Sequence, residues 1–160
     1  MRFRTPRPED GPAVTRLVAD CPPLDVNSAY CNLLQCDHFA ETCVVAEAAD
    51  GLAGWISGYR PPSAPEDIFV WQVAVRADAR GQGLGGRMLA ELIRRPAVRG
   101  ATRLITTVTE SNQASLSMFA GFARRGGMTL SRTPKYERDR HFEGLHETEW
   151  QVSIGPLPTS

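Results

Sequence analysis

The sequence predicts a mixed α/β fold in a single domain spanning residues 1–160. Three observations lead to this prediction. The length suits one domain, segments with helical spacing of apolar residues alternate with β-rich segments, and one central run, residues 68–75, is almost continuously apolar. Such a run is typical of a strand that is buried on both faces of a sheet. We therefore expect a mixed central sheet flanked by helices.

The first half of the chain supplies the beginning of this sheet and two helices. Proline and acidic residues mark the start of the first helix, Asn27 and Ser28 can cap the second, and Asp50-Gly51 is typical of a hairpin turn. The expected elements are a strand at 3–5, a helix at 8–20, a helix through about residue 39, strands at 42–47 and 52–59, and a proline-rich loop at 60–67.

The second half continues with alternating helices and strands. After the central strand, apolar residues recur at helical spacing until Pro96. The expected elements are a helix at about 83–95, a strand at 103–108, a short helix at 112–119 that stops near Gly121, and a strand around 149–154. Residues 126–144 show no pattern that assigns them to a helix or a strand.

Composition narrows the classes of partner. With 18 basic and 18 acidic residues the formal charge is zero, which gives no support to nucleic-acid or membrane binding. No apolar run is long enough for a membrane span, and the first residues do not resemble a signal peptide. The cysteines lack the C-x-x-C spacing of a zinc or redox site, so we expect no metal and free thiols in the reducing cytoplasm; they are Cys21, Cys31, Cys36 and Cys43.

The loop from Arg80 to Gly86 (Arg-Gly-Gln-Gly-Leu-Gly-Gly) has the composition of a pyrophosphate site. Glycine lets backbone approach an anion closely, a helix that begins at the loop offers unpaired N–H groups, and Arg80 adds charge. Its glycines also fit the dinucleotide pattern G-x-G-x-x-G, although the five-residue offset from the strand argues against it. A P-loop would need Gly-Lys-Ser/Thr, which is missing, and a plain turn before a helix is the remaining alternative.

Two motifs in order resemble those of the GNAT superfamily of N-acetyltransferases. The first joins the strand residues 73–75 to the pattern Q/R-x-x-G-x-G/A on Arg80, Gly83 and Gly85, and the second is Asn-Gln-Ala-Ser at residues 112–115. The resemblance covers about residues 4–154. It implies a GNAT fold, in which the mixed sheet contains a splayed pair of strands.

The resemblance also implies acetyl-CoA as co-substrate. The pantetheine arm would pair with the strand through Val73 and Val75, the pyrophosphate would lie on the amides of residues 82–86, and Asn112 would reach either part. The implied cofactor-binding residues are Gln72, Val73, Val75, Arg80, Gly81, Gln82, Gly83, Leu84, Gly85, Gly86, Asn112 and Ser115.

One position departs from the family pattern. Many GNAT members carry a tyrosine seven residues after the asparagine, and this tyrosine protonates the leaving thiolate. The sequence has Phe119 there, so we expect water or direct solvent protonation.

A narrower resemblance is to the bacterial diaminobutyrate acetyltransferases, which make N4-acetyl-L-2,4-diaminobutyrate on the way to the compatible solute ectoine. It is carried by segments outside the glycine loop, namely residues 24–30, 38–47, 58–62, 69–75 and 141–149. It implies L-2,4-diaminobutyrate as the small-molecule substrate, acetylated on its γ-amine, and no nucleic acid or membrane partner.

The substrate carries two ammonium groups and one carboxylate, so acidic residues are expected in its site. An aliphatic ammonium is only about 0.1% neutral at pH 7, so the reactive amine needs a proton acceptor, while a carboxylate on the other amine orients the substrate. We expect Asp25 and Glu149 to be anchors, Glu147 to be a further substrate-binding and candidate catalytic residue, and Trp71 to form a wall of the pocket and to be the second catalytic candidate.

Several alternatives remain open. Asp25 can equally be a turn acid, Glu147 and Glu149 exposed strand acids, and Trp71 a core residue. A GNAT enzyme for another small amine and an acyl-CoA-binding module without activity are the other functional interpretations. Since dimers are frequent in such families, a homodimer is expected by analogy alone.

Overall fold

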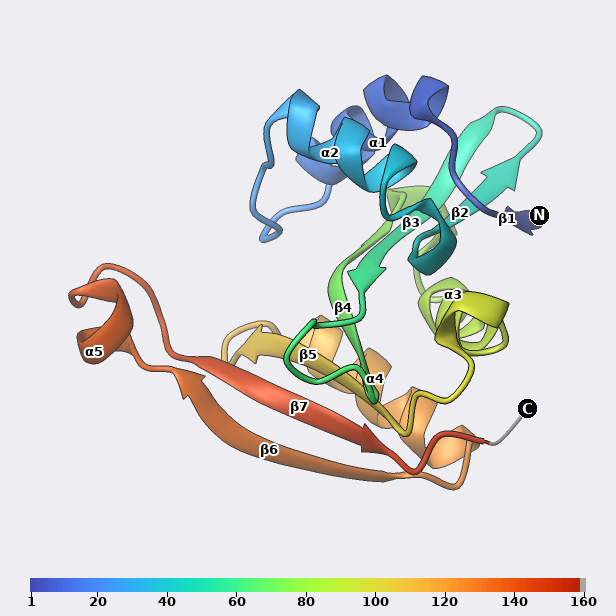
Figure 1. The fold of residues 1–160 in the computed structure, drawn as a ribbon. Coiled ribbons are helices and arrows are strands. Elements are labelled where there is room, and N and C mark those ends of the chain that lie inside the picture. The colour runs from blue at the N-terminus through green and yellow to red at the C-terminus, as the bar shows by residue number, and fades with distance from the viewer. Residues whose placement is uncertain (159–160) are drawn as a thin grey trace.

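The computed structural model describes residues 1–158, and its central feature is a seven-stranded mixed sheet (Figure 1). The strand order is β1-β2-β3-β4-β5-β7-β6, and only the β4–β5 pair is parallel. The strands are β1 (Arg2–Arg4), β2 (Val44–Ala48), β3 (Gly51–Tyr59), β4 (Asp67–Val75), β5 (Arg103–Thr109), β6 (Thr129–Tyr136) and β7 (Glu149–Gly155).

Helices cover both faces of the sheet. The helices are α1 (Gly11–Ala19), α2 (Ala29–Asp37), α3 (Leu84–Ile93), α4 (Gln113–Arg125) and the short α5 (Arg138–Phe142). One apolar cluster joins α1 and α2 to the first strands around Trp55, and a larger one joins α3 and α4 to the other face. Ser28 caps α2 as predicted, because its Oγ accepts a hydrogen bond from the Cys31 amide at 3.0 Å. Within residues 1–158, no helix is long and apolar enough to cross a membrane.

The β4–β5 pair is splayed, as the GNAT fold predicts. The two strands pair only from Asp67 to Phe69 and then diverge (Figure 1). The closed end is held by Arg103, whose guanidinium donates two hydrogen bonds to the buried Asp67 carboxylate, at 2.8 and 2.9 Å. A pocket lies in the open part of the splay, so β4 is not buried on both faces as its apolar run predicted. Trp71, on the open side, is 45% exposed.

The helix α4 is longer than its sequence pattern predicts. It continues through Gly121 and ends at Arg125, because Phe119, Phe122 and Ala123 bury its inner face. Gly121 does not stop the helix; a side chain there would lie 3.2 Å from Arg125 Nη1.

The segment without a predicted structure forms β6 and α5. β6 is the edge strand beside β7, and its side chains are exposed except for half-buried Leu130. A strand with no buried face carries no alternation of apolar and polar residues, which explains why its sequence gave no signal. Together with α5 and β7 it forms an arm that extends away from the helices (Figure 1).

Candidate active site

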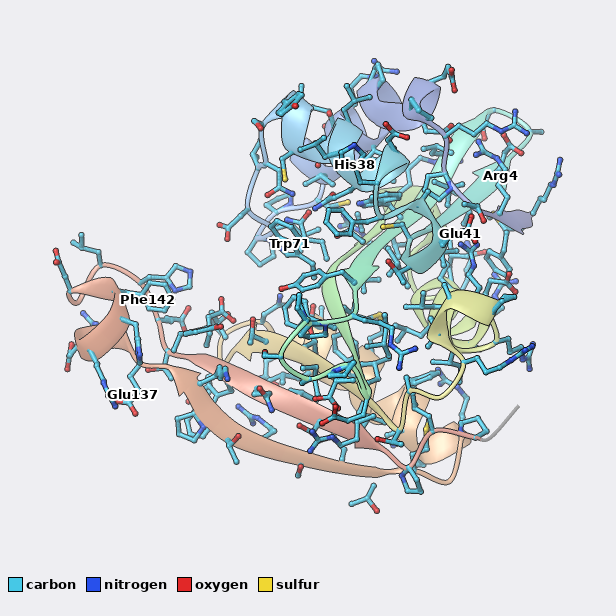
Figure 2. The ribbon with its side chains drawn as sticks, viewed as in Figure 1. Arg4, His38, Glu41, Trp71, Glu137 and Phe142 are labelled. Carbon is cyan, nitrogen blue, oxygen red and sulfur yellow. The ribbon has the colours of Figure 1, made fainter. Side chains whose placement is uncertain are left out.

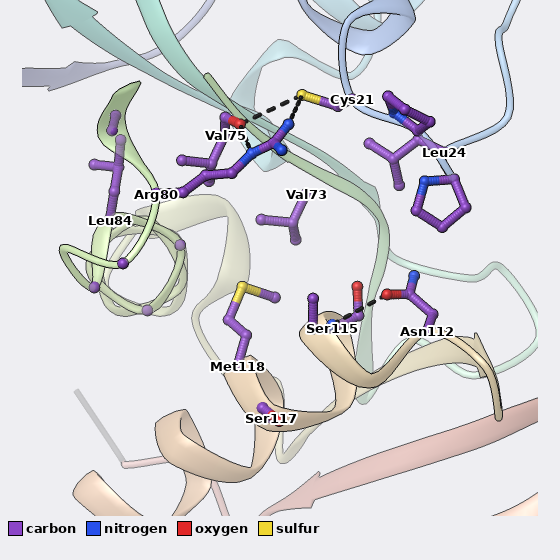
Figure 3. A pocket seen from close by; sticks show the side chains of 18 of the residues that line it. Cys21, Leu24, Val73, Val75, Arg80, Leu84, Asn112, Ser115, Ser117 and Met118 are labelled. Atoms are coloured by element: carbon purple, nitrogen blue, oxygen red, sulfur yellow. Dashed lines mark hydrogen bonds between the residues drawn. The ribbon is translucent and has the colours of Figure 1, made fainter. Parts of the chain in front are cut away.

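A cavity of about 450 Å³ lies where β4 leaves β5, between the end of β4, the glycine loop and the first turns of α4 (Figure 3). Its walls combine backbone-rich loop segments with apolar and hydroxyl side chains. Its lining includes Cys21, Pro22, Pro23, Leu24, Val73, Val75, Arg80, Gly81, Gly83, Leu84, Gly85, Gly86, Asn112, Ser115, Ser117, Met118 and Arg125. Ten of the twelve residues that the resemblance assigned to the cofactor line this cavity: eight come from β4, the glycine loop and the start of α3, and Asn112 and Ser115 line the opposite side. Gln72 and Gln82 do not line it.

The glycine loop has the backbone geometry that its composition predicts. Gly81 and Gly83 adopt left-handed conformations, with φ of +74° and +69°, and Gly83 directly precedes α3. Gly85 and Gly86 are buried against α4, where a Cβ atom would collide with Met118 Sδ and Arg125 Nη2. Glycine therefore lets the start of α3 pack tightly against α4 and leaves the N-terminal amides of a ten-residue helix beside the cavity.

Arg80 ties this loop to the end of β4. Its Nε donates to the Val75 carbonyl at 2.9 Å, and its Nη2 donates to Cys21 Sγ at 3.5 Å (Figure 3). The side chain also lines the cavity, so its positive charge faces the space where an anion would lie. The Arg80 guanidinium, which the sequence assigned to the pyrophosphate site, thus makes some of its hydrogen bonds to the protein itself.

The free edge of β4 presents alternate residues to the cavity. The Arg76 amide donates to the Ala53 carbonyl on β3, at 2.9 Å. In an antiparallel ladder, residues alternate between bonding the partner strand and pointing away from it, so Val75 and Val73 direct their backbone groups to the other edge. Both residues line the cavity, which fits the pairing with an extended ligand arm that the resemblance implied.

The second motif forms the opposite wall. Asn112 caps α4, with its Oδ1 accepting from the Ser115 amide at 3.2 Å (Figure 3). Phe119 is buried on the same helix and lines a smaller hollow of about 50 Å³ inside the splay, next to Val73 and Thr106. The residue at the position of the usual GNAT tyrosine therefore faces the splay, but Phe119 has no hydroxyl group.

A second hollow of about 530 Å³ lies on the other side of the loop, between α3 and α4. It shares Gly83, Gly86 and Arg125 with the first cavity, and Arg87 and Arg94 also line it. Ile93, Phe122 and Met128 supply apolar surface. A ligand crossing the glycine loop would therefore meet cations and apolar surface on the far side, which suits a phosphorylated adenosine.

Acidic residues lie near the open end of β5, where Glu149 of β7 pairs with Thr109. Glu149 begins β7 and is partly buried, and burial raises its pKa; hydrogen bonding to Thr107 and the charge of His146 act in the opposite direction. The charges of Asp25 and Glu147 lie close enough to raise this pKa further. Asp25 and Glu147, from two distant parts of the chain, thus both lie within electrostatic range of Glu149. Glu147 is exposed, and its Oε2 accepts a hydrogen bond from Ser111 Oγ at 2.5 Å.

Trp71 lies on β4, two residues before Val73 of the cavity lining. It is half exposed, its ring lies 6.5 Å from that of Tyr59 at an interplanar angle of 79°, and it faces the open space beside the loop that carries Asp25 (Figure 2). Its neighbour Gln72 is buried and turns its side chain toward that loop, where Nε2 donates to the Asp25 carbonyl at 2.7 Å. Trp71 is therefore a wall residue rather than part of the core.

Sequence reasoning missed several residues of the site. Thr107, Ser111 and His146 contact the acidic group, and Met118 and Arg125 form the wall opposite the glycine loop. They lie at single positions of a strand, a helix or a connecting segment, without a motif of their own, so only their place in the fold identifies their role. Among residues 1–158, no three His, Cys, Asp or Glu side chains converge as a metal site would require.

Comparison with known proteins agrees with this geometry. The profile of the "Acetyltransferase (GNAT) family" matches residues 12–122. The chain is 48% identical to the L-2,4-diaminobutyric acid acetyltransferase of Methylotuvimicrobium alcaliphilum, over 95% of this chain and 88% of that protein, and 46% identical to that of Vibrio cholerae, over 99% and 91%.

The chain belongs to the GNAT acetyltransferase family. A solved structure of the diaminobutyrate acetyltransferase of Paenibacillus lautus, in complex with its substrate L-2,4-diaminobutyric acid and coenzyme A, is similar at 38% identity and a TM-score of 0.92, covering 99% of this chain and 96% of that one. The predicted GNAT fold and the narrower resemblance are both confirmed. The predicted homodimer and the individual residue roles stay predictions.

Proposed function

We propose that the protein transfers the acetyl group of acetyl-CoA to the γ-amine of L-2,4-diaminobutyrate, which gives N4-acetyl-L-2,4-diaminobutyrate for ectoine synthesis. The observation that carries this proposal is that the glycine-loop cavity, which Val73 lines, lies in the same splay as Glu149, and that Asp25 and Glu147 lie within electrostatic range of Glu149. The family relationship supplies the substrate.

The cavity fits the co-substrate. The two hollows on either side of the glycine loop share Gly83 and Gly86 in their linings, and the loop combines left-handed glycines with a helix start. Bound acetyl-CoA would supply the thioester that the amine attacks. The chain holds its arm along β4, and backbone N–H groups near Val73 are placed to polarise the thioester carbonyl.

The acidic group fits the two ammonium groups of the substrate. A carboxylate beside the non-reacting amine fixes the orientation of diaminobutyrate, and we assign this anchoring role to Asp25, which is exposed on the loop facing the splay. The amine nitrogen becomes acidic as its bond to carbon forms. A carboxyl group with a raised pKa is the better acceptor for that proton, and burial gives Glu149 this property. We therefore propose Glu149, expected from the sequence to be an anchor, as the proton acceptor in place of Glu147.

Transfer is direct in this proposal. The Cys21 thiol donates to the Val75 carbonyl at 3.4 Å and accepts from Arg80 Nη2 at 3.5 Å. Within residues 1–158, the Cys21 thiol has no hydrogen bond to a side chain that would act as a base. This argues against an acyl-cysteine step. Solvent protonates the departing thiolate, since Phe119 cannot.

A thiol-release assay with diaminobutyrate, ornithine and lysine as acceptors tests the substrate. We expect the highest kcat/KM for diaminobutyrate and N4-acetylated product by NMR. Equal rates with the longer diamines, or none with diaminobutyrate, would overturn the assignment and leave the fold untouched. Asp25→Ala should raise the KM for diaminobutyrate by about tenfold or more and leave that for acetyl-CoA unchanged. Asp37→Ala, an exposed carboxylate on α2, is the matched control.

We also propose a cytoplasmic location. The four cysteines within the described residues are free thiols, as proteins of reducing compartments have, and acetyl-CoA is made and used there. Fractionation of cells expressing a tagged chain tests this, and recovery in an exported fraction would contradict it.

A further inference from the structure

Gln72 is a buried amide at the centre of a polar network. Its side chain is only 4% exposed, and buried amides require hydrogen-bond partners. Its Nε2 donates to the Asp25 carbonyl at 2.7 Å, and its Oε1 accepts from Asn27 Nδ2 at 2.9 Å. Its backbone amide donates to Ser57 Oγ on β3, at 3.2 Å. The Gln72 side chain on β4 thus forms hydrogen bonds with two residues of the loop between α1 and α2.

The same network continues into the helices. Asn27 Nδ2 also lies 3.4 Å from Asn32 Oδ1, and Asn32, which is fully buried, donates to Thr15 Oγ1 at 2.9 Å. The outer end of the network is therefore fixed within the packed α1–α2 pair. Its inner end is Gln72, which is the part that reaches the strand carrying the site.

The Asp25 loop has few other contacts that hold it. Pro22, Pro23, Asp25 and Val26 are exposed, while half-buried Leu24 packs against the apolar cluster around Trp55. A loop with few buried apolar side chains has low local stability. The two hydrogen bonds with Gln72 therefore contribute to its placement relative to β4.

We propose that Gln72 is a positioning residue for the acyl acceptor: it fixes the Asp25 loop against β4 and so sets the distance between the substrate anchor and the acetyl group. This inference rests on the proposed function of Asp25. Gln72 is adjacent in sequence to Val73, whose backbone edge faces the cavity, and to Trp71, which faces the acceptor side. Anchor and thioester are consequently held by neighbouring residues of one strand.

The orientation of the Gln72 side chain separates this role from cofactor binding. The residue lines the small hollow inside the splay but is absent from the lining of the 450 Å³ cavity. Its amide is directed to the loop instead. Loss of the side chain should therefore leave acetyl-CoA binding intact, although the sequence resemblance placed Gln72 among the cofactor residues.

Diaminobutyrate makes this role measurable, because it has two amines. When the anchor holds one ammonium at a fixed distance from the acyl carbon, only the other amine reaches the thioester. A loosened loop permits the reversed placement. Without the hydrogen bonds of Gln72 to the Asp25 loop, we thus expect acetylation at the α-amine in addition to the γ-amine. A general loss of stability would not produce this mixture of products.

The test compares Gln72→Met, which keeps the volume, with Asn27→Ala and with Thr15→Val, a control at the outer end of the network. For Gln72→Met and Asn27→Ala we expect the KM for diaminobutyrate to rise about tenfold, the KM for acetyl-CoA to stay within about twofold, and α-acetylated product to appear in the NMR spectrum. Thr15→Val should lower the melting temperature and keep the wild-type product ratio.

Two results would overturn the inference. The first is a folded Gln72→Met protein with wild-type KM for diaminobutyrate and only γ-acetylated product. The second is a parallel rise of both KM values, which would return Gln72 to the cofactor site. If the wild-type enzyme itself does not acetylate diaminobutyrate, the proposed function fails, and this inference fails with it. If Gln72→Met does not fold, Asn27→Ala decides by the same criteria.

Discussion

Replacing Gly83 with alanine isolates the contribution of loop conformation to acetyl-CoA binding. Gly83 has φ of +69°, and a Cβ atom there would meet nothing within 4 Å. The substitution therefore adds no clash, and its whole effect is the strain of a left-handed alanine, about 1 kcal/mol. If the glycine loop of the variant leaves the left-handed conformation in the free enzyme, binding of acetyl-CoA must restore it, and this costs the same free energy of about 1 kcal/mol. The KM for acetyl-CoA should then rise about fivefold.

Gly100 supplies a matched control. It is also exposed, has φ of +80°, and has nothing within 4 Å of an added Cβ, but it lies in the turn before β5, away from the cavity lining. Both variants should lose about 2–4 °C in melting temperature, and only Gly83→Ala should change the KM in the thiol-release assay. An unchanged KM in Gly83→Ala, or an equal rise in Gly100→Ala, would refute the assignment of this loop to the co-substrate.

Three further changes probe the acidic site, the closed end of the splay and the buried thiols. Because burial raises the pKa of Glu149, wild-type kcat/KM should fall as the pH drops through that raised pKa. Glu149→Gln should lose most of its activity and should no longer show this decrease at low pH. A decrease that persists in Glu149→Gln would contradict the role of Glu149 as proton acceptor. The raised pKa also means that the native state loses stability as the pH rises through it, so Glu149→Gln should not unfold more easily at pH 8, as urea melts will show. Arg103→Ala leaves the buried Asp67 carboxylate without its partner and should lower the free energy of unfolding by about 1–3 kcal/mol, whereas a change below the error of urea titration would deny the pair this function. Burial raises the pKa of Cys36 to about 11 and that of Cys43 to about 12, so mass spectrometry should find both unalkylated after iodoacetamide treatment of the native protein at pH 8, and labelling as fast as in urea would show that this region opens.

The parts of the fold that the sequence could predict are those with a local signature. Helix α3 follows a glycine loop and has helical spacing of buried residues from Leu84 to Leu92. The helix α2 begins at a capping serine. In both cases the residues that carry the pattern are also those that bury apolar surface or satisfy the helix end, so local and tertiary preferences agree.

The parts that could not be predicted depend on tertiary contacts. The glycine at 121 ends a helix in isolation, yet burial of Phe122 and Ala123 beyond it extends α4 by more than a turn. The strand β6 has no buried face and thus no periodicity. The apolar run of β4 could not reveal that one side opens onto a pocket, because an apolar wall of a ligand site and a core strand have the same composition.

The site shows the same division. The glycine loop was predictable because backbone conformation and anion binding both select glycine at particular positions. The acidic group was predictable only as residue types, since nothing local in the sequence shows that Asp25 approaches Glu149. Thr107 has no motif at all, and only the register of β5 against β7 places it near Glu149.

The open edge of β4 has a defined length, and this has a consequence for aggregation and for ligand choice. An unpaired strand edge is a template for pairing with another chain. Here two side chains already occupy its end carbonyls, since Thr106 Oγ1 donates to Val70 and Arg80 Nε donates to Val75. The free stretch between them is four residues, or roughly 13 Å at the rise of a strand. Such a short edge gives a strand of another molecule few backbone groups to pair with. It also limits the length of the extended ligand arm that can pair with β4.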